Sequence, residues 1–256
     1  MVLQILPALI LFLTHFSAGQ LAPPEFNTEI KFILQTESTK EAYERLRLGR
    51  KQSKDRRTYF FDTPNLDLYR SRLNLRTRQE IGEDKVEVTV KILGMRFSEV
   101  DAAWFSIRGF KCENDQADQT VTPNCSLESK VASSLVEEVL ENHRAIKDLL
   151  SADQWEFLTQ FYRALDSVPW RALRAFGPIQ SRSWKLPVEA LPAKLAVENW
   201  TLPNHESNME ISLRVPTSQV EEARSSLLLF LRKQQLQIAP GAEGKTLWAL
   251  TSLSKN

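Results

Sequence analysis

The sequence predicts an α+β protein with a mainly antiparallel sheet that can curl into a barrel. Three observations carry this prediction. Segments in which apolar and polar residues alternate recur along the chain, a helical stretch interrupts them near the middle, and an amphipathic helix follows the last of them. The chain has 256 residues, with no internal repeat and no low-complexity linker, and these features indicate one domain.

The elements of the N-terminal half follow from periodicity and turn residues. Residues 28–34 (TEIKFIL) predict a strand, and residues 38–50 predict a helix because Ser38 can cap its first turn. Four strands are then expected, over residues 56–63, 73–80, 84–93 and 102–113. Pro64 ends the first of these strands, and Gly82 marks a hairpin between the second and the third.

The C-terminal half begins with a helical insert. From Ser126 to about Leu165 the pattern favours helices, over residues 135–150 and 151–165. Three more strands are expected, over residues 176–186, 193–202 and 208–216. An amphipathic helix over residues 217–236 closes the predicted order.

The first twenty residues, MVLQILPALILFLTHFSAGQ, are typical of a secretory leader. An apolar run from Val2 to Phe16 precedes small residues, so cleavage is expected after Gly19. This predicts a signal peptide over residues 1–19 and an exported domain, periplasmic or secreted, over residues 20–256 with no stable membrane span. The run lacks a preceding basic residue, so an uncleaved anchor or a buried first helix is the alternative.

Cysteine usage agrees with export. Cys112 and Cys125 are the two cysteines of the chain, and they bracket a polar segment that we expect to be a loop. In an oxidising compartment this spacing favours a disulfide between them, and two free thiols are the alternative.

Several classes of site are excluded by what the sequence lacks. Outside the leader it has two histidines, His143 and His205, which gives little support for histidine metal sites or catalytic triads. The eight glycines give little support for a glycine-rich phosphate loop. The segment GAEGKT resembles the end of such a loop, but Ala239 stands where its first glycine should be. The formal net charge of +1 argues against a nucleic-acid-binding domain, which is usually basic throughout.

Charged residues recur at two-residue spacing in most predicted strands, so they share one face of each strand. The sets are Glu29 and Lys31; Arg76 and Arg78; Glu87, Thr89 and Lys91; Lys111 and Glu113; Lys194, Ala196 and Glu198; and Glu210, Ser212 and Arg214. These faces are either the solvated sides of half-buried strands or the inner wall of a curled sheet. In the second case the wall would hold a polyanion between its bases, with acids left to bind a metal ion.

Five motifs recur in the order seen in a known family. EIKF, YFFDTPNLDLY, LNLRTRQ, VEVTVK and MEISLRV resemble the CYTH, or triphosphate tunnel metalloenzyme, superfamily over roughly residues 27–250. The resemblance implies an antiparallel eight-stranded β-barrel forming a triphosphate tunnel, with flanking helices and a helical insert. Members include thiamine triphosphatases, inorganic tripolyphosphatases, class IV adenylate cyclases, RNA triphosphatases and polyphosphate polymerases.

The resemblance also implies roles for individual residues. Glu29 and Lys31 match the catalytic opening motif. The implied phosphate-binding residues are Lys31, Arg76, Arg78, Lys91, Arg182 and Lys245. The implied ligands of Mg²⁺ or Mn²⁺ are Glu29, Glu113 and Glu210.

Two positions depart from the family pattern. Asn27 and Ser212 stand where the family has metal-binding acids, and neutral oxygens hold a divalent ion less tightly than carboxylates do. We therefore predict an exported protein that binds inorganic tripolyphosphate, polyphosphate or an organic triphosphate and hydrolyses it with a divalent metal. The alternative is a catalytically impaired polyanion-binding module.

Overall fold

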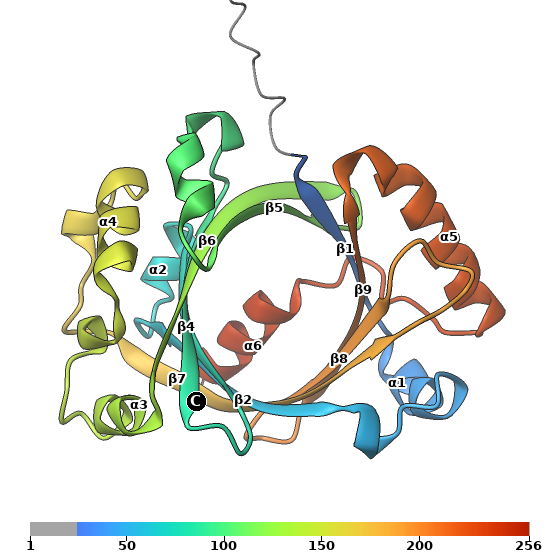
Figure 1. The fold of residues 1–256 in the computed structure, drawn as a ribbon. Helices are drawn as coiled ribbons and strands as arrows, with labels where there is room; N and C mark the ends of the chain where they lie inside the picture. The colour runs from blue at the N-terminus through green and yellow to red at the C-terminus, as the bar shows by residue number, and fades with distance from the viewer. Residues whose placement is uncertain (1–24, 256) are drawn as a thin grey trace, which may run out of the picture.

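A computed structural model describes residues 25–255, and its centre is a closed barrel of nine strands (Figure 1). The predicted signal peptide over residues 1–19 lies outside the described residues. The strands are β1 (Asn27–Ile33), β2 (Lys54–Asp62), β3 (Leu73–Glu80), β4 (Lys85–Leu93), β5 (Phe110–Ala117), β6 (Thr120–Ala132), β7 (Arg174–Leu186), β8 (Leu195–Thr201) and β9 (Ser207–Pro216). Around the barrel they follow the order β1-β5-β6-β4-β3-β2-β7-β8-β9.

The helices are α1 (Thr36–Arg45), α2 (Asp67–Arg70), α3 (Ser133–Leu140), α4 (Ala152–Phe161), α5 (Val220–Lys233) and α6 (Lys245–Ser254). Short 3-10 helices join them at Arg50–Gln52, Phe97–Glu99, Ala102–Ser106, Ile146–Leu149, Leu165–Ser167 and Thr217–Gln219. The predicted α+β barrel with flanking helices and a helical insert is confirmed. In the described part of the chain, no helix has the length and apolar character needed to cross a membrane.

The strand count and one pairing differ from the prediction. The barrel has nine strands rather than eight, and β1 pairs with β5 in parallel, whereas every other neighbouring pair is antiparallel. The connection between these two strands contains β2, β3 and β4, and this length permits a parallel arrangement.

The additional strand is β6, which the sequence interpretation divided between a loop and the start of the helical insert. The segment between the cysteines is a hairpin that turns at Asp118, a residue with φ of 52°. Residues 126–132 continue β6 along β4, and helical structure begins only at Ser133. Residues 102–109, expected to be part of a strand, form a 3-10 helix and a turn before β5.

Cys112 and Cys125 face each other across this hairpin and form a disulfide, which confirms the predicted bond. Both are buried in the outer core. Disulfides of this kind are typical of proteins from oxidising compartments.

The apolar faces of the strands point outward and form two cores under the helices. One core lies under α3 and α4, where Val136, Val139 and Phe157 cover β4 and β6. The other lies under α1 and α5, where Leu227 and Leu231 of α5 cover β9 and β1 (Figure 1). Burying these faces against helices leaves the charged faces of the same strands to line the inside of the ring.

The turn that follows β2 is built around a buried carboxylate. Asp62 accepts hydrogen bonds from the backbone N–H groups of Thr63, Leu68 and Tyr69, at 2.7, 2.8 and 3.0 Å. These bonds satisfy donors at the start of α2 that have no partner within the helix. They fix the path from β2 into β3, which carries the paired arginines.

The last helix, α6, packs against the inner face of the barrel at one end (Figure 1). Its Ala249 and Leu250 contact a third apolar cluster to which the inward-facing Phe60 and Trp200 belong. The sequence interpretation did not predict this helix. At this end the inner wall is apolar and covered, whereas farther along the barrel it is charged.

Candidate functional site

The charged faces singled out in the sequence meet inside the barrel. Strand register shows this directly, because side chains of paired residues lie on the same face of a sheet. Thr58 pairs with Arg78, which pairs with Glu87, which in turn pairs with Lys130. The charged residues on this inward face include Glu29, Lys31, Lys54, Arg56, Arg76, Arg78, Glu80, Glu87, Lys91, Lys111, Glu113, Asp115, Glu128, Lys130, Lys185, Glu198, Glu210 and Arg214.

Arg76 is a buried cation on the inward face of β3. Among the described residues no acidic side chain pairs with it, and its Nε is buried without a hydrogen-bond partner. Burial, and next the neighbouring guanidinium of Arg78, lower the pKa of Arg76. Arg78 itself is paired, since its Nη2 lies 2.7 Å from Glu87 Oε1.

Two predicted lysines share one carboxylate. Asp115 accepts from Lys31 Nζ at 2.7 Å and from Lys91 Nζ at 2.6 Å. Burial opposes ionisation of Asp115, but the two lysines outweigh it and lower its pKa. Burial lowers the pKa of Lys91 despite this partner. Because Lys91 is on β4 and Asp115 is on β5, the contact spans the inner face of β6, which lies between these two strands.

Lys245, at the first position of α6, is held by two carboxylates. Its Nζ lies 2.8 Å from Glu210 Oε1 and also contacts Glu198 Oε2. The same ammonium lies 5.0 Å from the centroid of the Trp200 ring. Burial opposes ionisation of Glu198, but Lys245 outweighs it and lowers the pKa of Glu198 to about 2.

Three acids lie close enough together to hold a metal ion: Glu29, Glu113 and Asp115, with one carboxylate oxygen of each within 4.8 Å of the others. Carboxylate oxygens are the ligands that Mg²⁺ and Mn²⁺ prefer, so this donor set suits either ion. Glu210, the third predicted ligand, is not in the group and is bound instead by Lys245. Asp115 takes the place that the sequence interpretation gave to Glu210.

The acid group already has cations on it. Arg214 Nη2 lies 3.0 Å from Glu113 Oε2 and 3.4 Å from Glu29 Oε2. Lys31 Nζ lies 3.2 Å from the same oxygen of Glu29. Burial opposes ionisation of Glu29, but Lys31 and Arg214 outweigh it and hold its pKa far below the ordinary value.

Arg182 is not brought together with the other predicted residues. It lies on the outer face of β7, where its Nε donates to Asp55 Oδ1 at 2.6 Å. The reason is a β-bulge, because Phe60 pairs with Phe176 whereas Thr58 pairs with Ile179. The extra residue reverses the alternation along β7, so Ser181 and Ser183 face inward and Arg182 faces outward.

Gly177 permits this bulge. A Cβ at this position would lie 2.8 Å from the carbonyl oxygen of Thr58, and its φ is 148°. Only glycine tolerates both conditions without displacement of the neighbouring strand.

The sequence interpretation gave no functional role to three residues that lie in the site. Asp115 was assigned to the loop between the cysteines, and Arg56 was placed in the strand expected over residues 56–63 without a role. Arg56 faces inward and donates to Ser183 Oγ at 3.0 Å. Arg214 was placed on the charged face but given no role. Strand alternation carried through the hairpin from Glu113 would have indicated Asp115.

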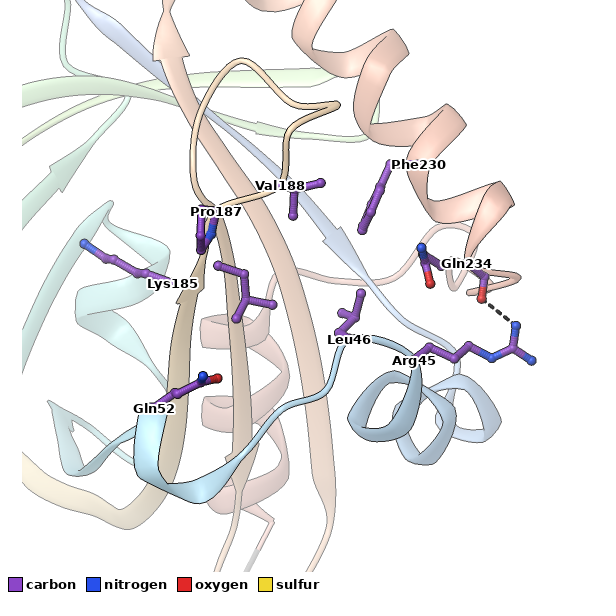
Figure 2. A pocket seen from close by; sticks show the side chains of 9 residues that line it. Arg45, Leu46, Gln52, Lys185, Pro187, Val188, Phe230 and Gln234 are labelled. Carbon is purple, nitrogen blue, oxygen red and sulfur yellow. Dashed lines mark hydrogen bonds between the residues drawn. The ribbon is translucent and has the colours of Figure 1, made fainter.

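A surface pocket of about 450 Å³ lies outside the barrel, between α1, the end of β7 and α5 (Figure 2). Arg45 lines it, and the guanidinium donates to the backbone oxygen of Gln234 at 2.6 Å. The remaining lining is largely apolar, with Leu46, Pro187 and Phe230. This pocket lacks the converging cations of the barrel interior.

Comparison with known proteins agrees with this geometry. Residues 25–111 match the CYTH domain. No curated protein sequence matches the chain.

Two solved structures share the fold. One is a candidate adenylate cyclase from Bacillus halodurans, with a TM-score of 0.58 and 17% identity over 88% of this chain and 97% of that one. The other is a candidate adenylyl cyclase from Hippeastrum, described as having dominant triphosphatase activity. It has a TM-score of 0.61 and 17% identity over 88% of this chain and 95% of that one.

Proposed function

We propose that this chain, whose residues 25–111 match the CYTH domain and whose strands form a closed barrel, binds a linear triphosphate or short polyphosphate inside its barrel and hydrolyses it. The Hippeastrum protein with triphosphatase activity supports the choice of reaction by analogy of fold. The single observation that carries the proposal is the environment of Arg76.

A guanidinium enclosed by protein and lacking a counter-ion is unfavourable, because the charge loses its hydration without gaining a partner. Arg76 comes close to this situation: among the described residues no carboxylate lies within ion-pair distance of it, its Nε has no hydrogen-bond partner, and Glu87, Glu128 and Glu198 act on it only from farther away. Phosphate oxygens supply what is missing, since guanidinium groups bind them through paired, charge-assisted hydrogen bonds. An anion beside Arg76 would also reach Arg78, two residues along the same face of β3.

The other inward cations extend this position into an elongated site. Lys91 and Lys31 both contact Asp115, and Arg56 on β2 is a diagonal neighbour of Arg78 on β3. Lys245 approaches from α6. A chain of phosphates matches this distribution better than a single phosphate does, because several separated cations can each bind one group.

Mg²⁺ or Mn²⁺ would be held by Glu29, Glu113 and Asp115, and would neutralise charge that develops on the transferred phosphoryl group. The protein's own part is positioning. Arginines and lysines align the phosphates, and the carboxylates of the acids lie along one side of the bound polyphosphate. Glu29 and Lys31 would orient the attacking water at this edge.

A binding module without turnover is the second candidate. Ser212 Oγ donates to Glu29 Oε1 at 3.2 Å, in the position where the family has an acid, and Asn27 removes another. The predicted leader and the disulfide favour export, where nucleotides are scarce. Inorganic tripolyphosphate is therefore the substrate we propose to test first.

The test combines binding and turnover on the purified full chain. Thermal unfolding is measured with and without tripolyphosphate, and phosphate release is measured with Mg²⁺, with Mn²⁺ and with EDTA. We expect tripolyphosphate to raise the melting temperature of the parent, and Arg76→Ala to abolish the increase. Arg57→Ala is the matched control, because Arg57 is the exposed, outward-facing arginine next to Arg56 on β2.

Metal-dependent release that Arg76→Ala abolishes would establish a triphosphatase. Stabilisation by tripolyphosphate without release would establish the binding module. An equal response in parent and Arg76→Ala would overturn the proposed site.

A further inference from the structure

Arg214 holds an unusual position among the charged residues inside the barrel. One guanidinium nitrogen contacts both Glu113 and Glu29, at 3.0 and 3.4 Å, and these are two of the three acids that could hold a metal ion. A metal ion bound by these carboxylates would have to compete with the Arg214 guanidinium for their oxygens. Glu29 Oε2 and Glu113 Oε2 are already used by Arg214.

The charges of this group balance without any added ion. Glu29, Glu113 and Asp115 carry three negative charges when ionised, and Lys31, Lys91 and Arg214 each contact at least one of them. A divalent ion entering an already neutral group would leave it with an excess of two positive charges. One cation therefore has to leave if a metal is to bind tightly.

Arg214 is the cation with access to solvent. Its side chain is 46% exposed, compared with 21% for Lys31 and 19% for Lys91. Arg214 can thus swing outward and regain hydration, whereas the two lysines remain enclosed and fixed by Asp115. Its long, flexible side chain makes such a movement possible without a change in β9.

We propose that Arg214 is a built-in counter-cation that occupies the metal-binding carboxylates and must be displaced before a divalent ion binds. This inference rests on the metal site of the proposed function. Arg214 then sets the metal concentration at which the protein becomes loaded. It acts as a positioning residue that holds Glu29 and Glu113 in place while no metal is bound.

The test is a titration of the full chain with Mn²⁺ alone, with free Mn²⁺ measured by electron paramagnetic resonance. Removing a positive charge at contact distance should strengthen binding, so we expect Arg214→Gln to lower the dissociation constant for Mn²⁺ about tenfold or more. Arg214→Lys keeps the charge and should bind Mn²⁺ within about threefold of the parent. Arg108→Gln removes an exposed arginine outside the group and should leave the affinity unchanged.

Melting temperatures without metal provide a second readout. Arg214→Gln should be less stable than the parent without metal and should gain more from saturating Mn²⁺. Unchanged or weaker Mn²⁺ binding in Arg214→Gln would overturn the inference, and so would an equal increase in Arg214→Lys. If Arg214→Gln does not fold, Arg214→Lys decides the matter. A dissociation constant for Mn²⁺ that differs from that of the parent by more than about threefold in this variant would overturn the inference.

The proposed function is tested separately by tripolyphosphate and Arg76→Ala without metal. Tighter Mn²⁺ binding in Arg214→Gln with no effect of tripolyphosphate would support the counter-cation and reject the phosphate site. Tripolyphosphate stabilisation with unchanged Mn²⁺ affinity in Arg214→Gln would support the phosphate site and reject the counter-cation.

Discussion

Arg76 and Arg78 differ in their surroundings although they lie two residues apart on β3. Arg78 is neutralised by Glu87, whereas Arg76 has no acidic partner in the described part of the chain. Most other charges inside the barrel are compensated in the way that Arg78 is. Lys245 with Glu198 and Glu210 is the most enclosed example, with side chains 16%, 17% and 6% exposed. Breaking such a group leaves a buried charge unpaired, which destabilises the fold.

Glu198→Gln should therefore make stability less dependent on pH in the acid range. The pKa of Glu198 falls from 4.5 to about 2 on folding, so its carboxylate stabilises the folded state above pH 4.5. That contribution, on the order of 3 kcal/mol, is lost as the pH falls toward 2, because the unfolded chain binds the proton first. Urea unfolding between pH 2 and 7 would show a shallower rise of stability with pH in Glu198→Gln.

Glu189→Gln is the control for this experiment, since Glu189 is exposed on the loop after β7. Identical pH profiles for the parent and Glu198→Gln would show that the contact with Lys245 does not stabilise the folded protein.

At the scale of elements, short connections decide where the charged faces lie. The turn after β2 is fixed by Asp62, and the bulge at Gly177 decides which side chains of β7 enter the barrel. The first feature lies in the connection between β2 and α2, and the second is an irregularity within β7. Both set the orientation of residues several positions away.

Asp62→Asn should destabilise the fold, because an amide nitrogen replaces one of the two oxygens that accept the three backbone N–H groups. A buried donor left without an acceptor costs about 1–3 kcal/mol. Urea denaturation of Asp62→Asn beside Asp84→Asn, an exposed position before β4, would measure the difference. Equal midpoints for the two variants would show that the carboxylate does not hold the turn.

How far the sequence predicts the elements depends on whether their signal is local. The alternation in residues 73–80 and 84–93 predicted β3 and β4, because one face of each strand is apolar. It placed Arg76 and Arg78 on one shared face and Lys91 on the charged face of the next strand, and left open whether these faces meet solvent or the interior of the barrel. The position of Arg182 could not be predicted, since a bulge formed with β2 reverses its direction. The strand β6 forms by pairing with β5 across a turn, and α6 is stabilised by packing on the apolar inner wall of the barrel. Neither signal is present in the local sequence. These relationships are not local.

At the scale of the whole molecule, the barrel places its apolar cores outside the ring and its charges inside. Closure depends on β5, which pairs in parallel with β1 and antiparallel with β6. The disulfide ties β5 to β6 beside this closing position. Its effect should therefore reach the whole barrel rather than one loop.

Replacing both cysteines by alanine should lower the free energy of unfolding by about 3 kcal/mol, the chain-entropy value for a loop of this size. The paired residues are separated by 13 positions in sequence. Unfolding of the parent with and without a reducing agent, compared with the double variant, would measure this. If the reducing agent leaves the free energy of unfolding of the parent unchanged, as it must for the variant, and the two proteins are equally stable, the hairpin pairing alone closes the barrel.

The position of α6 also bears on how a ligand of the proposed kind would move. Because α6 packs on the inner wall at one end of the ring, a ligand of the proposed kind would enter and leave from the other end. A linear anion would thread inward by its terminal group, and any excess length would trail into solvent. The protein would thus act on the ends of a linear polyphosphate and shorten it from a terminus. Cyclic phosphates, which have no terminus, would bind weakly.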